Sequence, residues 1–201
     1  MSEISEKNEP WVYKVFGSTI GSIIMFFLEV AQIIVIALAI IIPVRYFLVQ
    51  PFVVKGVSME PNFYENDYLI VDEITYRFRD VQRGEAVVLR PPTGVNDYYI
   101  KRIIGLPGET VEIKNGQIKI YNSDYPNGFV LDEDYINEIT TDHMRVVLNS
   151  DQYFVMGDNR DQSLDSRSFG PITKDEIVGR VWLRGFPINR IGVISAPDYS
   201  F

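Results

Sequence analysis

One apolar segment near the N-terminus constrains this chain more than any other feature. Val30 to Val49 contains a single charged residue, Arg45, close to its end. As a helix with a rise of about 1.5 Å per residue, the segment is about 30 Å long, which is the thickness of the hydrocarbon core of a bilayer. It is too long for the apolar part of a cleaved signal peptide, and no Ala-x-Ala sequence closes it. The segment therefore predicts a membrane-spanning helix, with a buried helix of a soluble protein as the alternative.

A second apolar stretch, Phe16 to Leu28, precedes this segment. It is too short to cross a bilayer alone, and we expect it to extend the helix along the membrane interface. The chain is thus expected to comprise an N-terminal segment (1–15), an anchor helix (16–49, with the span at about 30–49) and a domain from residue 50 to 201.

Residues 50–201 have the pattern of an all-β domain. Short runs of β-branched and aromatic residues alternate with turns rich in Gly, Pro, Asn and Asp. The expected strands are Phe52–Val57, Tyr68–Ile74, Ala86–Arg90, Tyr98–Ile104, Thr110–Lys114, Gln117–Tyr121, Tyr153–Met156 and Ile177–Arg184. Asn115-Gly116 predicts a type I′ hairpin between two of them. The fold class is therefore mainly β, with an N-terminal transmembrane helix.

Residues 122–150 interrupt the strand pattern with six acidic residues and one basic residue, Arg145. We expect a small, solvated surface insertion here, with His143 exposed in it.

The composition removes several kinds of chemistry. The chain has no cysteine, so a thiol nucleophile and a cysteine-based zinc site are excluded. His143 is the only histidine, so it is the only possible base of a Ser-His-Asp triad. The net charge of −8 argues against a nucleic-acid partner, because such proteins present a basic face. A hydrolase with these residues is left with a serine or threonine nucleophile and a lysine base.

Two motifs supply such a pair. Ser58 begins Ser-Met-Glu-Pro-Asn-Phe just after the apolar segment, and Lys101 lies in Tyr-Ile-Lys-Arg-Ile-Ile-Gly-Leu-Pro-Gly. A lysine acts as a base only when burial lowers its pKa, and the isoleucines around Lys101 predict such a setting. Taken alone, a lysine in a strand is usually on the surface, so this pattern by itself leaves both possibilities open.

A third motif, Gly157-Asp-Asn-Arg-Asp-Gln-Ser-Leu-Asp-Ser-Arg167, is rich in oxygen donors. The spacing of a calcium loop is absent, because Arg160 and Gln162 occupy positions where such loops carry ligands. No metal ion and no cofactor is expected.

Together, the three motifs and the anchor resemble the type I signal peptidase family from about Gln50 to Arg184. The resemblance implies that Ser58 is the nucleophile, Lys101 is the general base and Ser163 orients the lysine amine. It also implies that Asp165 and Arg167 brace the site. Gly56 stands where some members carry a serine that helps bind the oxyanion, so main-chain donors near Ser58 are expected to replace it.

The resemblance further implies a membrane-bound endopeptidase that removes signal peptides from secretory preproteins after Ala-x-Ala-like sites. Shallow apolar pockets for small residues are expected from Phe52, Val54, Met59, Leu69, Val88 and Ile100. The lysines and arginines beside the anchor do not orient it. The family places the N-terminus in the cytosol and the catalytic domain outside the cell membrane.

Two alternatives stay open at this point. A self-cleaving Ser/Lys repressor shares the dyad, but it carries a DNA-binding segment where this chain has an apolar span. A catalytically silent scaffold tethered to the membrane is the other, although both dyad residues are present. The chain also departs from the family at Asn62-Phe63, where Thr-Leu is frequent, and at Glu85, where Asp is usual.

Overall fold

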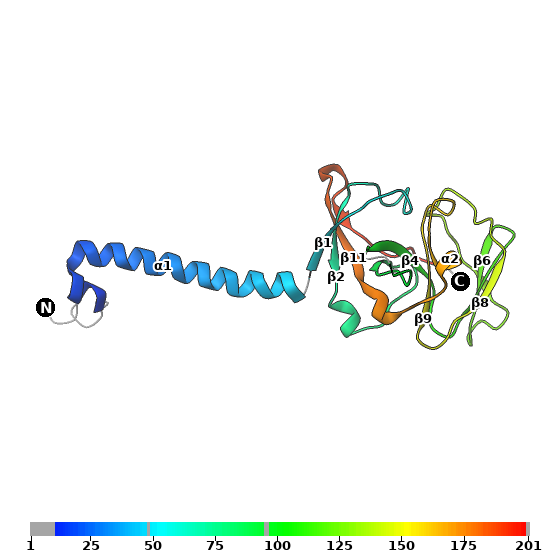
Figure 1. The fold of residues 1–201 in the computed structure, drawn as a ribbon, viewed down its shortest axis with the longest axis horizontal. Helices are drawn as coiled ribbons and strands as arrows, with labels where there is room; N and C mark the ends of the chain where they lie inside the picture. The colour runs from blue at the N-terminus through cyan, green and yellow to red at the C-terminus, as the bar shows by residue number, and fades with distance from the viewer. Residues whose placement is uncertain (1–10, 48, 95–96, 200–201) are drawn as a thin grey trace. The chain divides into compact units, whose positions relative to one another are not determined.

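The protein is described from a computed structural model that defines residues 11–47, 49–94 and 97–199 (Figure 1). Contacts within the chain divide it into two units, Met1–Tyr46 and Phe47–Phe201.

The first unit holds one long helix, α1 (Trp11–Phe47), interrupted at Gly17, whose φ of 75° is not helical. Residues Gly17–Pro43 are long and apolar enough to cross a membrane, with a mean hydropathy of 2.7. The apolar stretch before Glu29 therefore belongs to the same helix as the expected span and does not form a separate element. At the other end, Val49 is the first residue of a strand and not the last residue of the anchor.

The second unit is built from antiparallel strands in two sheets. The larger sheet has the order β1-β2-β11-β3-β4-β9-β10, with β12 beside β11. Its members are β1 (Val49–Val53), β2 (Tyr68–Asp72), β3 (Ala86–Leu89), β4 (Tyr99–Gly105), β9 (Gln152–Met156), β10 (Ile172–Thr173), β11 (Ile177–Phe186) and β12 (Gly192–Val193).

The smaller sheet has the order β7-β6-β5-β8, and in Figure 1 its strands β6 and β8 lie on the opposite side of this unit from β1 and β2. Its members are β5 (Thr110–Lys114), β6 (Gln117–Tyr121), β7 (Phe129–Val130) and β8 (Met144–Val147). Short helical turns connect the strands: η2 (Thr75–Arg77), α2 (Ser166–Phe169), η3 (Lys174–Glu176) and η4 (Ile188–Arg190).

Seven of the eight expected strands are found within a few residues of their predicted ends. The exception is Phe52–Val57, because β1 ends at Val53 and the chain then turns toward Ser58. The Asn115-Gly116 hairpin is confirmed: φ is positive at both residues, and Lys114 pairs with Gln117. Strands β7, β8, β10 and β12 were not expected, because runs of two to four residues show no clear alternation.

Strand β4 is buried along both faces from Lys101 to Gly105. Ile104 packs with the residues of the smaller sheet, and Ile103 packs with Val87 and Val155 of the larger one. Because apolar side chains cover both faces, a charged residue on this strand leaves water when the protein folds. This burial is what the fold contributes to the chemistry of Lys101.

Candidate active site

Ser58 and Lys101 meet in the folded domain. Ser58 lies in the turn after β1, and Lys101 lies near the start of β4. The Lys101 Nζ atom is 2.7 Å from the Ser58 Oγ atom. This is hydrogen-bond distance, so a proton can pass between the hydroxyl and the amine without a bridging water.

The pKa of Lys101 is lowered from its ordinary value of 10.5 to about 8. Burial is the main cause, since the side chain is only 3% exposed and the charged form loses hydration. The positive charge of Arg167 acts in the same direction, whereas Asp165 and Asp158 oppose it. With this pKa, about a tenth of the Lys101 side chains are neutral at pH 7, and this fraction can accept the serine proton.

The third motif packs directly against the turn that carries Ser58, residues 56–62, which we call the serine turn. The Asn159 N–H donates to the Ser58 carbonyl oxygen at 3.1 Å. A Cβ atom at Gly157 would lie 2.4 Å from that same carbonyl and 2.2 Å from Ser163 Oγ. Gly157 must therefore lack a side chain for the two loops to approach, a requirement that its place in the motif did not reveal.

Gly56 is found in a left-handed backbone conformation, with φ at +81°. A Cβ atom there would have no neighbour within 4 Å, so the space is open, but any other residue would be strained. The expectation that main-chain donors near Ser58 replace a side-chain donor at position 56 stays a prediction. A serine at this position would carry a conformational cost that the sequence did not indicate.

Asp165 and Arg167 form a two-pronged ion pair, with both joining distances at 2.8 Å. The Gly157 N–H also donates to the Asp165 carboxylate. Burial favours the neutral form of Asp165, but the bonds from Arg167 and Gly157 outweigh it and lower the pKa of Asp165. These bonds all lie within the third motif and therefore hold its own conformation.

Ser163 is brought next to this pair. Its Oγ atom is buried and forms no hydrogen bond of ordinary geometry with any residue that the structure describes, Lys101 included. It lies close enough to Asp165 to contribute to the lowered pKa of that carboxylate. The orienting contact to the lysine amine that we expected from Ser163 is not formed in this conformation.

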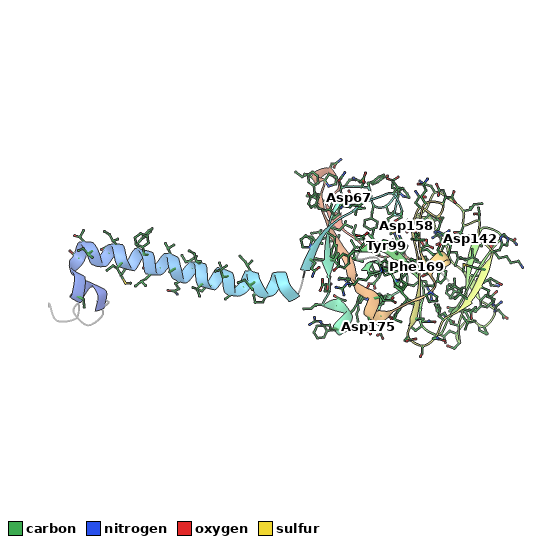
Figure 2. The ribbon with its side chains drawn as sticks, in the orientation of Figure 1. Asp67, Tyr99, Asp142, Asp158, Phe169 and Asp175 are labelled. Carbon is green, nitrogen blue, oxygen red and sulfur yellow. The ribbon has the colours of Figure 1, made fainter. Side chains whose placement is uncertain are left out.

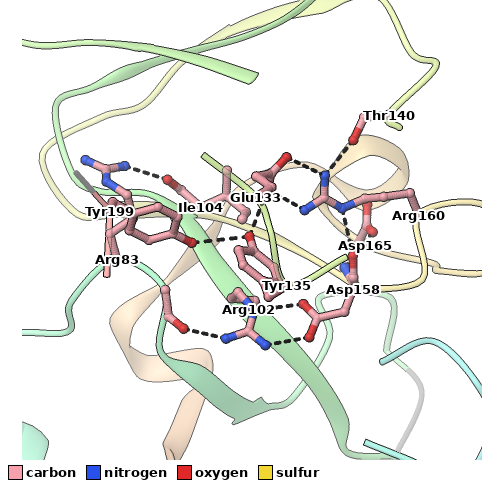
Figure 3. A network of polar contacts seen from close by, with 12 residues as sticks. Arg83, Arg102, Ile104, Glu133, Tyr135, Thr140, Asp158, Arg160, Asp165 and Tyr199 are labelled. Carbon is pink, nitrogen blue, oxygen red and sulfur yellow. Dashed lines mark hydrogen bonds and ion pairs between the residues drawn. The ribbon is translucent and has the colours of Figure 1, made fainter. Parts of the chain in front are cut away.

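Two further buried arginines hold the third motif, and the sequence did not single out either of them (Figure 3). Arg102 binds Asp158 through two of its nitrogens, and its third donates to the Gly84 carbonyl at 2.8 Å. Arg160 donates to the Gly157 carbonyl and binds Glu133. Burial disfavours the charge of Arg102, but its bonds to Asp158 outweigh this and raise its pKa. The sequence did contain a signal for a buried ion pair: Arg102 is a second charged residue, directly after Lys101, in a strand whose other residues are largely apolar.

The acidic segment 122–150 is more than the solvated surface that its composition suggested. Glu133 and Thr140 bind Arg160, and Asp142 binds Arg167 at 2.7 Å. These side chains contact the arginines because a buried guanidinium without an anionic or polar partner is unfavourable. His143 is exposed, as expected. In Figure 2, Asp142 lies toward the smaller sheet, and Tyr99 and Asp158 lie nearer the centre of the domain.

A cavity of about 620 Å³ opens beside Ser58 and Lys101. Among the residues that line it are five of the six expected pocket residues: Phe52, Val54, Leu69, Val88 and Ile100. The sixth, Met59, is only 1% exposed and packs below the serine turn with Phe63, so the structure does not place it along the cavity. Phe52 and Tyr98, which both line the cavity, meet edge to face with their ring centroids 5.2 Å apart.

In the described part of the chain, no three His, Cys, Asp or Glu side chains are grouped to hold an ion.

Comparison with known proteins identifies the family. Residues 27–186 match the family described as signal peptidase, peptidase S26. The chain belongs to the signal peptidase family. A probable signal peptidase I-2 of Synechocystis sp. is 37% identical over 84% of this chain and 77% of its own length. A signal peptidase I of Bacillus amyloliquefaciens is 39% identical over 82% of this chain and 90% of its own.

A crystal structure of a signal peptidase I from Enterococcus faecalis is 31% identical, covers 51% of this chain and 97% of its own, and gives a TM-score of 0.44. Membership in the S26 family makes this chain a serine peptidase and bears out the resemblance seen in the motifs.

In this signal peptidase, the buried lysine should lower stability. The unfolded chain holds the Lys101 proton up to about pH 10.5 and the folded chain only to about pH 8, so unfolding takes up a proton in that window and stability rises with pH across it. Below pH 8 the folded state carries the full burial penalty. We expect Lys101→Met to raise the free energy of unfolding at pH 7 by roughly 3 kcal/mol, and by less at pH 10.

Denaturant unfolding of the detergent-solubilised chain at both pH values checks this prediction. Lys114→Met, the same change at an exposed lysine, should show no such pH dependence. A Lys101→Met protein that is less stable than wild type at pH 7 would contradict the assigned burial penalty.

Proposed function

We propose that this chain is a membrane-bound endopeptidase that removes N-terminal signal peptides from exported preproteins, with Ser58 as nucleophile and Lys101 as general base. One observation carries the proposal: the 2.7 Å contact between the Ser58 hydroxyl and an amine whose pKa is lowered to about 8. The membership of the chain in the signal peptidase family supports the class of substrate.

The proposed reaction follows from these positions. The neutral Lys101 amine takes the hydroxyl proton as Ser58 Oγ attacks the carbonyl carbon of the scissile bond. The resulting ammonium then gives its proton to the leaving amine, and the released mature protein leaves an acyl group on Ser58. Lys101 next removes a proton from water as the water attacks the ester, and it returns that proton to Ser58 Oγ when the ester bond breaks and the signal peptide is freed. Each proton transfer uses this chain's own side chains.

The tetrahedral intermediate needs hydrogen-bond donors near Ser58. Gly56 has no side chain to donate, so main-chain N–H groups of the serine turn are the proposed donors. The hydrogen bond from the Asn159 N–H to the Ser58 carbonyl supports this role, because it fixes the turn before substrate arrives.

The cavity suits an extended peptide with small side chains. Its volume of about 620 Å³ must hold the backbone and side chains of several substrate residues, and its walls include Val54, Leu69 and Val88. In an extended chain alternate side chains share a face, so residues −1 and −3 before the scissile bond would both point into the cavity. We therefore propose cleavage after Ala-x-Ala-like sequences.

The helix Gly17–Pro43 is the proposed anchor in the lipid bilayer. The cell membrane, a single crossing, a cytosolic N-terminus and an extracytoplasmic catalytic domain complete the proposal. This topology places the catalytic domain where exported preproteins emerge. The proposed partners are thus secretory preproteins and membrane lipid, with no nucleic acid.

The dyad is tested by removing each member. Ser58→Ala and Lys101→Ala should each abolish precursor cleavage, because one variant lacks the nucleophile and the other lacks the base. Lys101→Arg should also be inactive, since a guanidinium does not deprotonate in this pH range. The measurement is cleavage of a signal-bearing precursor by detergent-solubilised protein at matched concentration.

Thermal melts would confirm that each dyad variant is folded. Activity at the wild-type level in either alanine variant would rule out the dyad, and an inactive wild-type protein would favour a silent scaffold.

The pH dependence should report the lysine. Below the pKa of Lys101, each fall of one pH unit reduces the neutral fraction about tenfold. We therefore expect kcat/KM to rise with pH and to level off above about pH 8. His143→Ala should leave this profile unchanged, because His143 is exposed and takes no part in the proposed reaction. A rising limb near pH 6.5 that disappears in His143→Ala would contradict the assignment.

Substrate selection should depend on the −1 residue. Replacing alanine with phenylalanine at −1 should block cleavage at that bond, since the ring competes with the substrate backbone for the space above Val88 and Ile100. Phenylalanine at −2 is the matched control and should be tolerated, because its side chain points away from the cavity. Mass spectrometry of the products identifies the cleaved bond. Efficient cleavage after phenylalanine would rule out the proposed assignment of the pocket residues.

A further inference from the structure

Asn62 ends the serine turn, at a position where the resembling family often has threonine. Its Nδ2 atom donates to the Asp158 Oδ2 atom at 2.9 Å and to the Tyr135 carbonyl oxygen at 2.8 Å. Its own carbonyl oxygen accepts a hydrogen bond from Arg184. The residue is thus bonded to three segments that lie far away in the sequence.

The Asp158 carboxylate joins the two halves of the dyad. It accepts one bond from Asn62, four residues after the nucleophile, and two from Arg102, the residue directly after the base. One buried carboxylate, 1% exposed, therefore connects the turn that carries Ser58 with the strand that carries Lys101. Nothing in the motif spacing indicates this connection.

The strand side of this connection is rigid. Arg102 is 3% exposed, donates to the Gly84 carbonyl and stacks on Tyr135 with its Cζ atom 4.4 Å from the ring centre. A buried charge with all its partners in place has no alternative position of similar energy. On the serine side, Asn62 binds the same carboxylate, and the Asn159 N–H binds the Ser58 carbonyl beside it.

An asparagine suits this position because its amide nitrogen carries two hydrogens in a fixed plane. It satisfies the Asp158 carboxylate and the Tyr135 carbonyl together. A threonine hydroxyl has one hydrogen and can satisfy only one of them. The asparagine therefore bonds the serine turn both to Asp158 and, through the Tyr135 carbonyl, to the acidic segment 122–150.

We propose that Asn62 is a positioning residue for the dyad, acting through Asp158 to hold Ser58 Oγ within hydrogen-bond distance of Lys101 Nζ. This inference rests on the proposed function. Displacements of about 1 Å from a reactive geometry can reduce a rate a hundredfold. Because Asn62 does not line the cavity, its loss should lower kcat and leave KM nearly unchanged.

The test compares Asn62→Val and Asn62→Thr, which have the same shape and differ in one hydroxyl group. Precursor cleavage by the full chain in detergent gives kcat and KM. Asn137→Leu, which removes an amide at an exposed site, is the control. We expect kcat to fall at least tenfold in Asn62→Val and by less in Asn62→Thr, with KM within twofold of wild type. Asn137→Leu should match wild type.

A pH profile separates positioning from general loosening of the fold. In Asn62→Val the rising limb should keep its midpoint near pH 8 while its plateau falls, because Lys101 stays buried. A loosened domain would hydrate Lys101 and move the limb toward higher pH, which would overturn the proposal. If Asn62→Val melts below the assay temperature, Asn62→Ala takes its place with the same expected result.

Other results also overturn the inference. They are an unchanged kcat in Asn62→Val, equal losses in the valine and threonine variants, or a raised KM with normal kcat. If wild type is active and Ser58→Ala is inactive, any of these results rules out the role of Asn62 and leaves the proposed function standing. A wild-type protein that does not cleave the precursor overturns the proposed function and the role of Asn62 together.

Discussion

The contact between the Lys101 amine and the Ser58 hydroxyl depends on keeping water away from a lysine. Strand β4 achieves this because it is buried on both faces, and the resulting loss of hydration lowers the pKa of Lys101 to about 8. The same burial costs stability, since the folded domain must accommodate an ionisable group with little solvent. In the proposed mechanism, this loss of stability accompanies a lysine that can act as a base near pH 8.

Several buried ion pairs surround the dyad and fix its geometry. Asp165 with Arg167, Asp158 with Arg102, and Glu133 with Arg160 all meet at or behind the third motif. Such pairs contribute little net stability, because desolvation offsets their attraction, but removing one partner is costly. Their contribution here is to position the loops: each charge has a single favourable place, so the loops beside Ser58 are held in one arrangement.

The acidic segment 122–150 takes part in this arrangement. It supplies Glu133, Thr140 and Asp142 to two of the arginines, so a stretch that resembles solvated surface in composition forms part of the support of the site. The cavity is lined by residues of β1, β2, β3 and β4, by the turn that carries Ser58 and by Gln162 and Leu164 of the third motif. Asn62 itself does not line the cavity, which is why its loss is expected to change kcat and not KM.

The sequence by itself determined the features that depend on neighbouring residues: the apolar helix, most of the strands, the hairpin at Asn115-Gly116, and a lysine set among isoleucines. Its motifs also indicated the family, which the comparisons confirm. Only the tertiary structure decided which acid pairs with which arginine, that Met59 packs below the turn, that Gly157 must lack a side chain, and that Asn62 reaches Asp158. Local periodicity records whether a side chain faces the core, but not which distant side chain it meets there. That choice is made when strands far apart in sequence pair and close the space between them.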